Sequence, residues 1–236
     1  MKIKWPHTLS ARALPNLQLA SAHHYLIESL FGHLHPEHDM CIMSMERVII
    51  IGSSGSGKST LARQLGQKTG LPVIHLDLHY WYPGWVASPD EVWRKEVQEL
   101  SQKPRWIMDG NYRETLDLRL AAADTVLFLD LPPLLCAWRA IYRRLQYRRR
   151  QRPDMAPGCQ ETLFGPDFPE FLLRIWDYPQ RARPDVLKRL AELDGATQVF
   201  HFQSRSEIHR FIANPGQYAA LLPRRSVKTG SQVSRA

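Results

Sequence analysis

Cysteine is scarce in this chain, and the few cysteines form no recognisable pattern. The 236 residues include three, Cys41, Cys136 and Cys159, with neither a C-x-x-C pair nor the spacing of metal ligands. This excludes the disulfide framework of a small secreted protein and gives no sign of a zinc site. Such cysteine use fits a reducing compartment, and we expect a cytoplasmic protein.

Long apolar runs are also missing. A membrane-spanning helix needs roughly 18 consecutive apolar residues, and the best stretch, Val126 to Trp138, is interrupted by Asp130 and two prolines. A secretory signal is disfavoured, because the first residues contain no uninterrupted apolar segment. We therefore expect no membrane partner.

Positive charge is concentrated in one part of the chain. The formal net charge is +8, and seven arginines fall between Arg139 and Arg152; without these seven the net charge is +1. No internal repeat, helix-turn-helix or other base-reading module is visible. Overall basicity therefore does not by itself indicate a nucleic-acid-binding protein.

Length and composition fit one sizeable α/β core with at most one insertion, since 44% of the residues are hydrophobic. Residues 1–44 show no clear period and contain six of the ten histidines. Three interpretations stay open: a disordered or loosely helical extension, a targeting segment, or a start assigned too far upstream, with Met43 or Met45 as initiator. Scattered surface histidines are commoner than a metal site. Residues 214–236 are predicted to be a disordered basic tail.

The strongest motif is a phosphate-binding loop. Gly52 to Ser59 read Gly-Ser-Ser-Gly-Ser-Gly-Lys-Ser, which matches G-x-x-x-x-G-K-S/T directly after the apolar run Val48–Ile51. In such loops backbone N–H groups and a helix N-terminus converge on one anion. We expect Lys58 to reach the β- and γ-phosphates of ATP and the Ser59 hydroxyl to ligate Mg²⁺. A flexible linker is the alternative. The expected nucleotide-binding residues are Gly52, Ser53, Ser54, Gly55, Ser56, Gly57, Lys58, Ser59 and Thr60.

From Met45 onward short apolar runs alternate with helical stretches, as a parallel sheet with crossover helices requires. One helix is predicted to start with Ser88 as N-cap and Glu91 completing a capping box. The predicted strands are Val48–Ile51, Val73–Leu76, Trp106–Met108, Val126–Leu129 and Gln198–Phe202.

Three of these runs lead into an aspartate: Asp77, Asp109 and Asp130. The carboxyl ends of parallel strands lie on the rim that carries the phosphate loop. Phosphoryl transfer needs a carboxylate to hold metal-bound water and an oxygen acceptor to orient or deprotonate the nucleophile. Asp77 and Asp109 are candidates for these roles, with a structural turn as the alternative. Asp130 precedes Leu-Pro-Pro, so a helix cap is an equal alternative there.

Two further segments allow two interpretations each. Residues 78–85, Leu-His-Tyr-Trp-Tyr-Pro-Gly-Trp, either wall a pocket for a planar acceptor or pack under a loop. On a helix from Pro133, arginines one turn apart form two basic stripes, Arg139 with Arg143 and Arg144 with Arg148. They form either a solvated face or a lid over about residues 139–175 that closes on the transferring phosphates. We favour the lid.

From Met45 to about Ala213 the chain resembles the bacterial topology-modulation proteins, small P-loop ATPases of the adenylate kinase-like group. The resemblance implies a three-layer α/β P-loop NTPase fold over residues 45–213, with a parallel five-stranded sheet, a helical arginine-rich lid, and ATP and Mg²⁺ as cofactors. Nothing in these residues explains an effect on DNA topology. The residues that carry the resemblance are Gly52 to Ser59, Leu76-Asp77 with Trp81, Pro83, Gly84 and Trp85, Asp109 to Tyr112, Leu129 to Pro132, and the arginine-rich helix.

Two functions follow as hypotheses. The first is an ATP-dependent phosphotransferase acting on a small-molecule or nucleotide acceptor. In it Lys58 neutralises phosphate charge, Ser59 and an aspartate, with Asp77 as the first choice, hold Mg²⁺, and Asp77 or Asp109 orients the acceptor. Its lid arginines are Arg143, Arg144 and Arg148. The second is a regulatory ATPase that binds nucleic acid through its basic helix and tail. We rank the kinase first.

Overall fold

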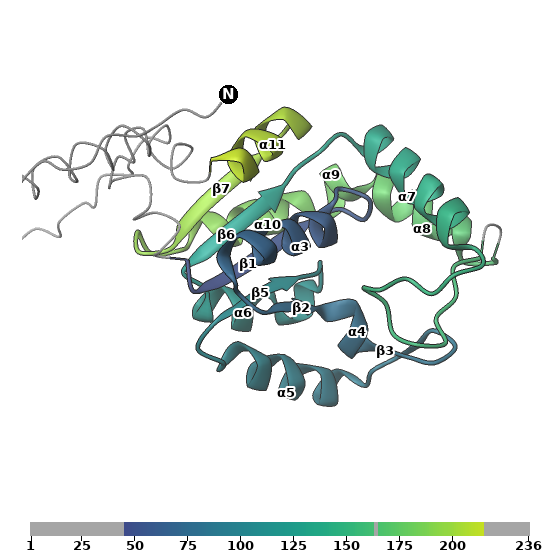
Figure 1. Cartoon of the computed structure of the whole chain (residues 1–236), viewed down its shortest axis with the longest axis horizontal. Coiled ribbons are helices and arrows are strands. Elements are labelled where there is room, and N and C mark those ends of the chain that lie inside the picture. The colour runs from purple at the N-terminus through teal and green to yellow at the C-terminus, as the bar shows by residue number, and fades with distance from the viewer. Residues whose placement is uncertain (1–44, 163–164, 215–236) are drawn as a thin grey trace, which may run out of the picture.

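The computed structural model describes residues 45–162 and 165–214, and a five-stranded parallel sheet lies at its centre (Figure 1). The strand order is β2-β5-β1-β6-β7, so β1 lies between β5 and β6. All five predicted strands and the α/β class are confirmed; only Leu76, expected at the end of a strand, instead begins a helix. The strands are β1 (Arg47–Gly52), β2 (Val73–His75), β5 (Trp106–Asp109), β6 (Thr125–Leu129) and β7 (Gln198–Phe202).

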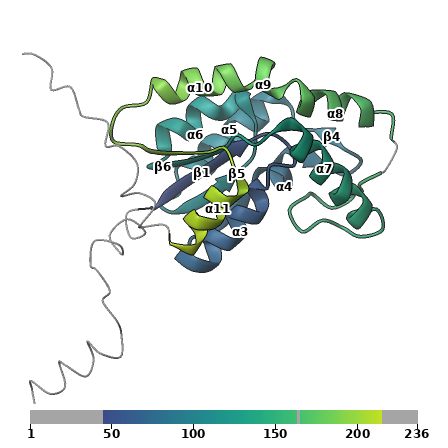
Figure 2. The same ribbon diagram turned by 90° about the horizontal axis from the view of Figure 1, so that it is seen from above.

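Helices cover both faces of the sheet and complete three layers (Figure 2). One face carries α3 (Lys58–Thr69) and α11 (Arg205–Ala213). The other carries α5 (Asp90–Ser101), α6 (Leu116–Ala122) and α10 (Arg183–Ala191). The remaining described elements are α4 (Leu76–Tyr80), a hairpin of β3 (Trp81–Tyr82) and β4 (Val86–Ala87), a 3₁₀ turn (Arg113–Thr115), α7 (Pro133–Tyr147), α8 (Phe168–Trp176) and α9 (Tyr178–Arg181).

The central strand divides the core in two, because successive side chains of a strand point to opposite faces. Ile49 faces the cluster that contains Trp93 of α5, whereas Ile50 faces the cluster that contains Leu61 of α3. Both isoleucines are fully buried. The near-continuous apolar sequence of β1 is thus explained by burial on both faces of the sheet. It fixes the strand whose end carries the phosphate loop.

Shortening a side chain in this core should cost a measurable part of the stability. Ile49→Val removes one buried methylene and is expected to lower the free energy of unfolding by about 0.5–1.5 kcal/mol. Val92 of α5 is 49% exposed, so Val92→Ala should change it by less than about 0.5 kcal/mol. Urea denaturation of the two variants measures both effects. Equal losses would mean that β1 is not the central core strand.

The predicted capping box at Ser88 is wrong. Helix α5 begins at Asp90 with Pro89 in the cap position and no side-chain cap hydrogen bond. The backbone N–H of Ser88 donates to the carbonyl of Tyr80 (2.9 Å), which holds Ser88 beside the hairpin and leaves its buried hydroxyl without a partner among the described residues. A capping box does form at α11, where Ser204 and Glu207 bond reciprocally.

Several expectations fall on other parts of the chain. The interpretations of residues 1–44, and the predicted tail from residue 215 onward, lie outside the described residues. Within residues 45–162 and 165–214 no helix has both the length and the apolar composition to cross a membrane.

Candidate active site

The phosphate loop runs from the end of β1 to the start of α3, and its glycines are required by close approaches. Gly55 has φ +80°, and a Cβ there would lie 2.1 Å from the carbonyl oxygen of Cys136. Gly52 has φ +143°, and a Cβ there would lie 2.4 Å from the carbonyl oxygen of Leu129. Residues with a side chain rarely adopt such backbone conformations, so glycine is required at both positions. The loop therefore has a defined conformation and is not a flexible linker.

Polar groups of the loop converge on the space in front of α3. The Lys58 ammonium donates to the carbonyls of Gly52 (3.0 Å) and Ser53 (2.9 Å), which folds the lysine back over the loop. Burial lowers the pKa of Lys58, against the opposing influence of Asp109 and Asp77. The hydroxyls of Ser53 and Ser56 are buried without a hydrogen-bond partner in the described part of the chain. Unpaired buried donors are costly, and a bound phosphate would satisfy them.

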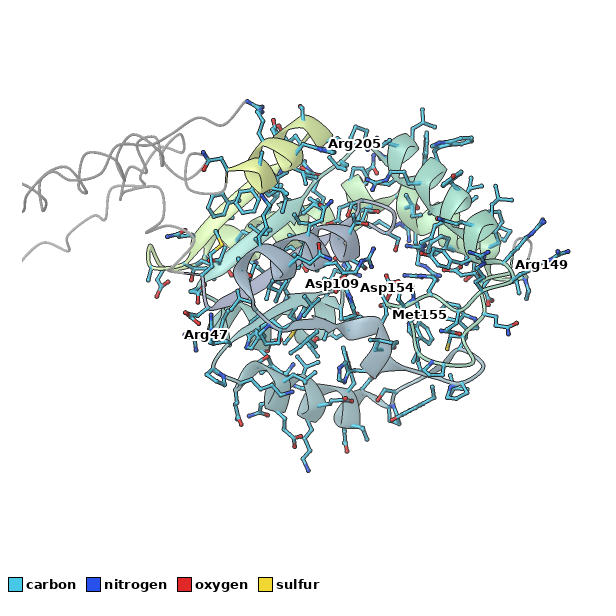
Figure 3. The ribbon with its side chains drawn as sticks, viewed as in Figure 1. Arg47, Asp109, Arg149, Asp154, Met155 and Arg205 are labelled. Atoms are coloured by element: carbon cyan, nitrogen blue, oxygen red, sulfur yellow. The ribbon has the colours of Figure 1, made fainter. Side chains whose placement is uncertain are left out.

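Ser59, at the start of α3, lies between two carboxylates. Its hydroxyl donates to Asp109, the last residue of β5, at 2.7 Å. It also contacts Asp154, whose pKa burial would raise but which hydrogen bonds from Arg152 and Ser59 hold well below the usual range. The second oxygen of Asp109 bonds the Nδ1 atom of His75. Figure 3 shows Asp109 and Asp154 at the centre of the molecule. The Ser59 hydroxyl has a single proton and cannot donate fully to both carboxylates. The two negative charges beside Ser59 therefore favour a bound cation there.

These residues fit Mg²⁺ better than a metal held by protein ligands alone. Among the described residues no group of three or more His, Cys, Asp or Glu side chains could enclose a metal ion. Mg²⁺ prefers oxygen ligands and keeps several waters, taking one or two protein ligands plus phosphate oxygens. Ser59 and Asp109 supply such oxygens beside the loop. The sequence analysis put Asp77 first as the aspartate beside Ser59, whereas in the structure Asp109 bonds Ser59.

We expect Asp109→Asn to weaken the response to Mg²⁺. Asparagine can still accept the Ser59 hydrogen bond, but it removes the negative charge that would hold metal-bound water. The Mg²⁺ concentration for half-maximal activity should therefore rise about tenfold. Asp185→Asn, at an i,i+4 ion pair with Arg189 on α10, is the matched control and should leave it unchanged. An unchanged Mg²⁺ titration for Asp109→Asn would remove Asp109 from the metal site.

The pairing of His75 with Asp109 should make stability depend on pH. Burial alone would lower the pKa of His75, but the hydrogen bond and charge of Asp109 outweigh it and raise the pKa above 6.5. The added stability is therefore fully present below about pH 6.5 and is lost as the pH rises through the folded-state pKa. Unfolding free energies of the wild type and His75→Gln should differ most at about pH 5.5 and converge in alkaline solution. A gap that widens with pH would contradict this pairing.

Asp77 lies in the first turn of α4, not at a strand end as the sequence suggested. Its carboxylate accepts a hydrogen bond of 2.6 Å from the Tyr112 hydroxyl. Burial raises the pKa of Asp77, while Tyr112 and Arg152 act in the opposite direction. The turn that carries Tyr112 is held by the fully buried Arg119, whose guanidinium donates to the carbonyls of Gly110 and Tyr112. A partly buried carboxylate close to Lys58 is thereby fixed in place.

The aromatic segment after Asp77 serves packing in two ways. Tyr80 contacts Trp93 and Tyr112 with ring centroids 5.1 and 4.6 Å apart, which joins α4 to the core. Trp81 packs instead against Met155 and its neighbours in the segment after α7. The interpretation as packing under a loop accounts for these contacts, and an acceptor wall stays a prediction.

The basic helix is α7, as predicted from Pro133, and its arginines have different surroundings. Arg139 donates to the carbonyl of Ser56 (3.0 Å) and so contacts the phosphate loop directly. Arg144 lies 3.2 Å from a Glu161 carboxylate oxygen, and Phe168 and Phe171 pack against its guanidinium.

The other two predicted lid arginines of α7 differ in exposure. Arg143 is 3.6 Å from Glu161, and burial, with the nearby charge of Arg152, lowers its pKa. Arg148 is exposed at the C-terminal end of α7, so the structure does not bring it to the loop.

The segment after α7 reaches the site through Asp154. Arg152, Asp154 and Glu161 form a buried cluster, with the Arg152 guanidinium 2.8 Å from Asp154 and 2.7 Å from Glu161. Hydrogen bonds tie this segment to the β3–β4 hairpin, from the Gly84 N–H to the Gly158 carbonyl (3.1 Å) and from the Trp85 indole to Gln160 (3.1 Å). These contacts hold Asp154 in position beside Ser59.

Asp130 has a structural role. It bonds Arg183 at 2.7 Å and His201 at 2.8 Å, and these contacts hold its pKa below its usual value although burial opposes them. Helix α7 begins only at Pro133, with Pro132 in the cap position. The interpretation of Asp130 as a helix cap is therefore wrong.

A cavity of about 260 Å³ adjoins the loop, and Asp77 is not among its lining residues. It is lined by Gly57 and Thr60 of the loop region, by Arg139, and by Arg205 and His209 of α11. A larger hollow of about 420 Å³ lies beside Asp124, at the end of the sheet where β6 begins, and is remote from the loop. The smaller cavity is the one that belongs to the site.

Sequence reasoning missed several residues of this site. His75, Arg152 and Asp154 were not named among its candidates, although each contacts Asp109 or Ser59 directly or through one neighbour. Arg139 was named only as part of a basic stripe, and it contacts the loop. The alternation Arg-Pro-Asp at residues 152–154, a charged pair inside a Pro-rich segment, was a signal that could have singled out Asp154.

Comparison with known proteins gives only distant similarities. No protein-family model matches the chain, and no curated protein matches it. Solved structures with a similar fold include a shikimate kinase from Bacteroides thetaiotaomicron, with 18% identity over 75% of this chain and all of that one, at a TM-score of 0.47. A sugar kinase from Janibacter sp. HTCC2649 has 18% identity over 76% of this chain and 96% of that one, at a TM-score of 0.42.

A gluconokinase from Sinorhizobium meliloti 1021 has 19% identity over 75% of this chain and 93% of that one, at a TM-score of 0.41. Likenesses of this degree carry no argument about activity, so the functional conclusion rests on the site itself. Membership of the topology-modulation family stays a prediction.

Proposed function

We propose that the protein is an ATP- and Mg²⁺-dependent phosphotransferase acting on a small-molecule or nucleotide acceptor. The observation that carries the proposal is the position of the Ser59 hydroxyl, next to Lys58 and between the carboxylates of Asp109 and Asp154. Phosphoryl transfer needs a phosphate-binding loop, a positive charge near the phosphates and a cation site beside them. The glycine-containing loop, Lys58 and the pair of carboxylates beside Ser59 match these three parts. Mg²⁺ held by Ser59 and Asp109 would offset the charge of the transferring phosphate.

The residues of this chain divide the work by position. The loop N–H groups and Lys58 bind the β- and γ-phosphates, while Ser59 and Asp109 hold the metal and its waters. The nucleoside part of ATP lies in the 260 Å³ cavity beside Arg139. Burial lowers the pKa of Lys58, and a bound triphosphate would reverse that change by pairing its charge.

The acceptor side is built around Asp77. A partly buried carboxylate with a raised pKa can accept a proton from an acceptor hydroxyl, and Tyr112 fixes its orientation. The buried cluster of Arg152, Asp154 and Glu161, with the partly buried Arg143 and Arg144 beside Glu161, covers this region and keeps water from the transferring group. Exclusion of water favours transfer to an acceptor over hydrolysis.

The nucleic-acid alternative gains no comparable support. Arg144 and Arg152 of the basic segment pair with Glu161, and Arg139 with a loop carbonyl, so these arginines do not form a free stripe for a phosphate backbone. Binding to a backbone would also weaken steeply as salt is added.

A label-transfer assay tests the proposal. The full-length protein is incubated with Mg²⁺ and γ-labelled ATP in the presence of nucleosides, nucleoside monophosphates, sugars and other small hydroxyl compounds. Label should appear on one class of acceptor, at a rate that changes little with salt. Release of the label only as inorganic phosphate, accelerated by DNA in a salt-sensitive manner, would contradict the proposal and favour the regulatory ATPase.

A further inference from the structure

A fully buried arginine of α6 lies near the candidate active site and has no acidic partner. Arg119 is 0% exposed and shares the buried side of α6 with Leu116 and Leu120, where helical spacing predicts an apolar side chain. It takes part in no ion pair among the described residues, and Asp117 of the same helix binds Arg94 instead. A buried charge without a carboxylate is costly to a fold, so stability alone does not explain this arginine.

The Arg119 guanidinium binds two backbone carbonyls of one turn. One terminal nitrogen donates to Gly110 (3.1 Å) and the other to Tyr112, while the Nε atom has no partner in the described part of the chain. Burial lowers the pKa of Arg119 to about 10, so the side chain stays charged at neutral pH. Hydrogen bonds from a charged donor are stronger than those from a neutral one, so the turn between the two carbonyls is held firmly.

This turn connects the end of β5 to the acceptor side of the site. It follows Asp109, whose backbone is held by the pairing of β5 with β1 and β2. Gly110 has φ +153°, and a Cβ there would lie 2.9 Å from the side chain of Leu76, the residue before Asp77. Tyr112 then donates its hydroxyl to Asp77 at 2.6 Å. A shift of the turn would therefore move the group that orients the Asp77 carboxylate.

Ring packing alone does not place the Tyr112 hydroxyl. The ring of Tyr112 contacts those of Tyr80 and Trp93, with centroids 4.6 and 4.8 Å apart. Aromatic contacts are favourable over a range of about 4.5–7 Å, whereas a hydrogen bond weakens steeply once its angle is poor. The carbonyls fixed by Arg119 therefore set the finer position of the hydroxyl.

We propose that Arg119 is a positioning residue of the phosphotransferase, and that it acts through Tyr112 to hold the Asp77 carboxylate in place for the acceptor hydroxyl. The inference rests on the proposed function. In that reaction the acceptor oxygen bonds to the γ-phosphorus, the bond from this phosphorus to the β–γ bridging oxygen breaks, ADP leaves, and Asp77 takes the hydroxyl proton. A displacement of about 1 Å can cost a hundredfold in rate. Asp109 is held by its strand neighbours, so the metal side of the site should not depend on Arg119.

Label transfer from γ-labelled ATP with Mg²⁺ to the panel of nucleosides, nucleoside monophosphates and sugars tests this inference on the full chain. Arg119→Lys keeps a positive charge but loses the planar fork that spans the two carbonyls. It should lower kcat about ten- to a hundredfold and leave the KM for ATP and the Mg²⁺ titration within about twofold of the wild type. The matched control is Arg94→Lys, which changes an exposed arginine of α5 that binds Asp117 and should leave all three unchanged.

A double-mutant cycle with Tyr112→Phe separates positioning from a general loosening of the fold. If Arg119 acts through the Tyr112 hydroxyl, Arg119→Lys should lower kcat by less than about threefold once that hydroxyl is absent, because coupled residues do not contribute independently. Losses that multiply in full overturn the proposal. So does a kcat of Arg119→Lys equal to that of the wild type.

The outcomes separate this inference from the proposed function. A wild type that transfers label to no acceptor overturns both, whereas an active wild type matched by Arg119→Lys overturns the positioning role alone. Circular dichroism checks the folding of the variants. If Arg119→Lys fails to fold, Arg119→Gln takes its place, because its amide can donate to one carbonyl without a buried charge. It should show the same dependence on Tyr112, and independent losses overturn the proposal.

Discussion

Replacing Lys58 with alanine is expected to lower ATP turnover by about a hundred- to a thousandfold, or below detection, while the fold is retained. The ammonium lies over the phosphate loop, 3.0 and 2.9 Å from two of its carbonyls, where the β- and γ-phosphates would bind. Preorganised charges aimed at the transferring group are typically worth this much in rate. Steady-state kinetics with saturating Mg²⁺ measures the loss.

The matched control is Lys68→Ala, which removes a lysine from the last turn of the same helix. It should leave turnover unchanged. Thermal denaturation of both variants separates loss of chemistry from loss of structure, because the two hydrogen bonds of Lys58 tie it only to the loop. Full activity in Lys58→Ala would remove the loop from the mechanism.

Asp77→Asn is expected to reduce kcat by about a hundredfold or more, with little change in the KM for ATP. Asparagine keeps the shape and can still accept the hydrogen bond from Tyr112, but it cannot accept a proton, and positioned bases contribute about this much. Because the pKa of Asp77 is raised above 3.8, the wild-type rate should also fall on the acid side at a higher pH than for an ordinary carboxyl group.

Asp185→Asn again serves as the control, since it alters an ion pair on α10 remote from the loop. An equal loss of kcat and rise in the KM for ATP would assign Asp77 to nucleotide binding. An unchanged kcat would leave it with a structural role beside Tyr112. Comparison with Asp109→Asn, whose main effect is expected on the Mg²⁺ titration, distinguishes the two carboxylates.

Local signals in the sequence predicted much of the fold. The apolar runs that became β1, β5 and β6 are buried on both faces, so composition alone identified them. The phosphate loop was predictable because its glycines are required locally, by positive φ angles and by backbone atoms too close to leave room for a Cβ. Strand-end position also singled out Asp109, which the sheet places within hydrogen-bond distance of Ser59, and its role there stays a prediction.

The rest of the site depends on contacts between distant segments. Asp154 reaches Ser59 because Arg152 binds both Asp154 and Glu161 inside a segment with no regular secondary structure. The helix and strand periodicities of a sequence cannot predict such a cluster. The assignment of Ser88 as a cap failed for the same reason, since a hydrogen bond to the distant Tyr80 carbonyl fixes its backbone.

The arginines of α7 were predicted as stripes from helical spacing, but spacing does not say what lies opposite each one. Arg144 pairs with Glu161, Arg139 donates to the loop carbonyl of Ser56, and Arg148 is exposed.

The central claim is that the loop between β1 and α3 holds a nucleoside triphosphate together with Mg²⁺. Isothermal titration calorimetry with a non-hydrolysable ATP analogue tests it most directly, with and without Mg²⁺, on the wild type and Lys58→Ala. The account predicts saturable binding with one analogue per chain, strengthened by Mg²⁺ and lost or at least tenfold weaker in Lys58→Ala. Binding of equal strength in both proteins, or no binding to the wild type with Mg²⁺ present, would contradict it.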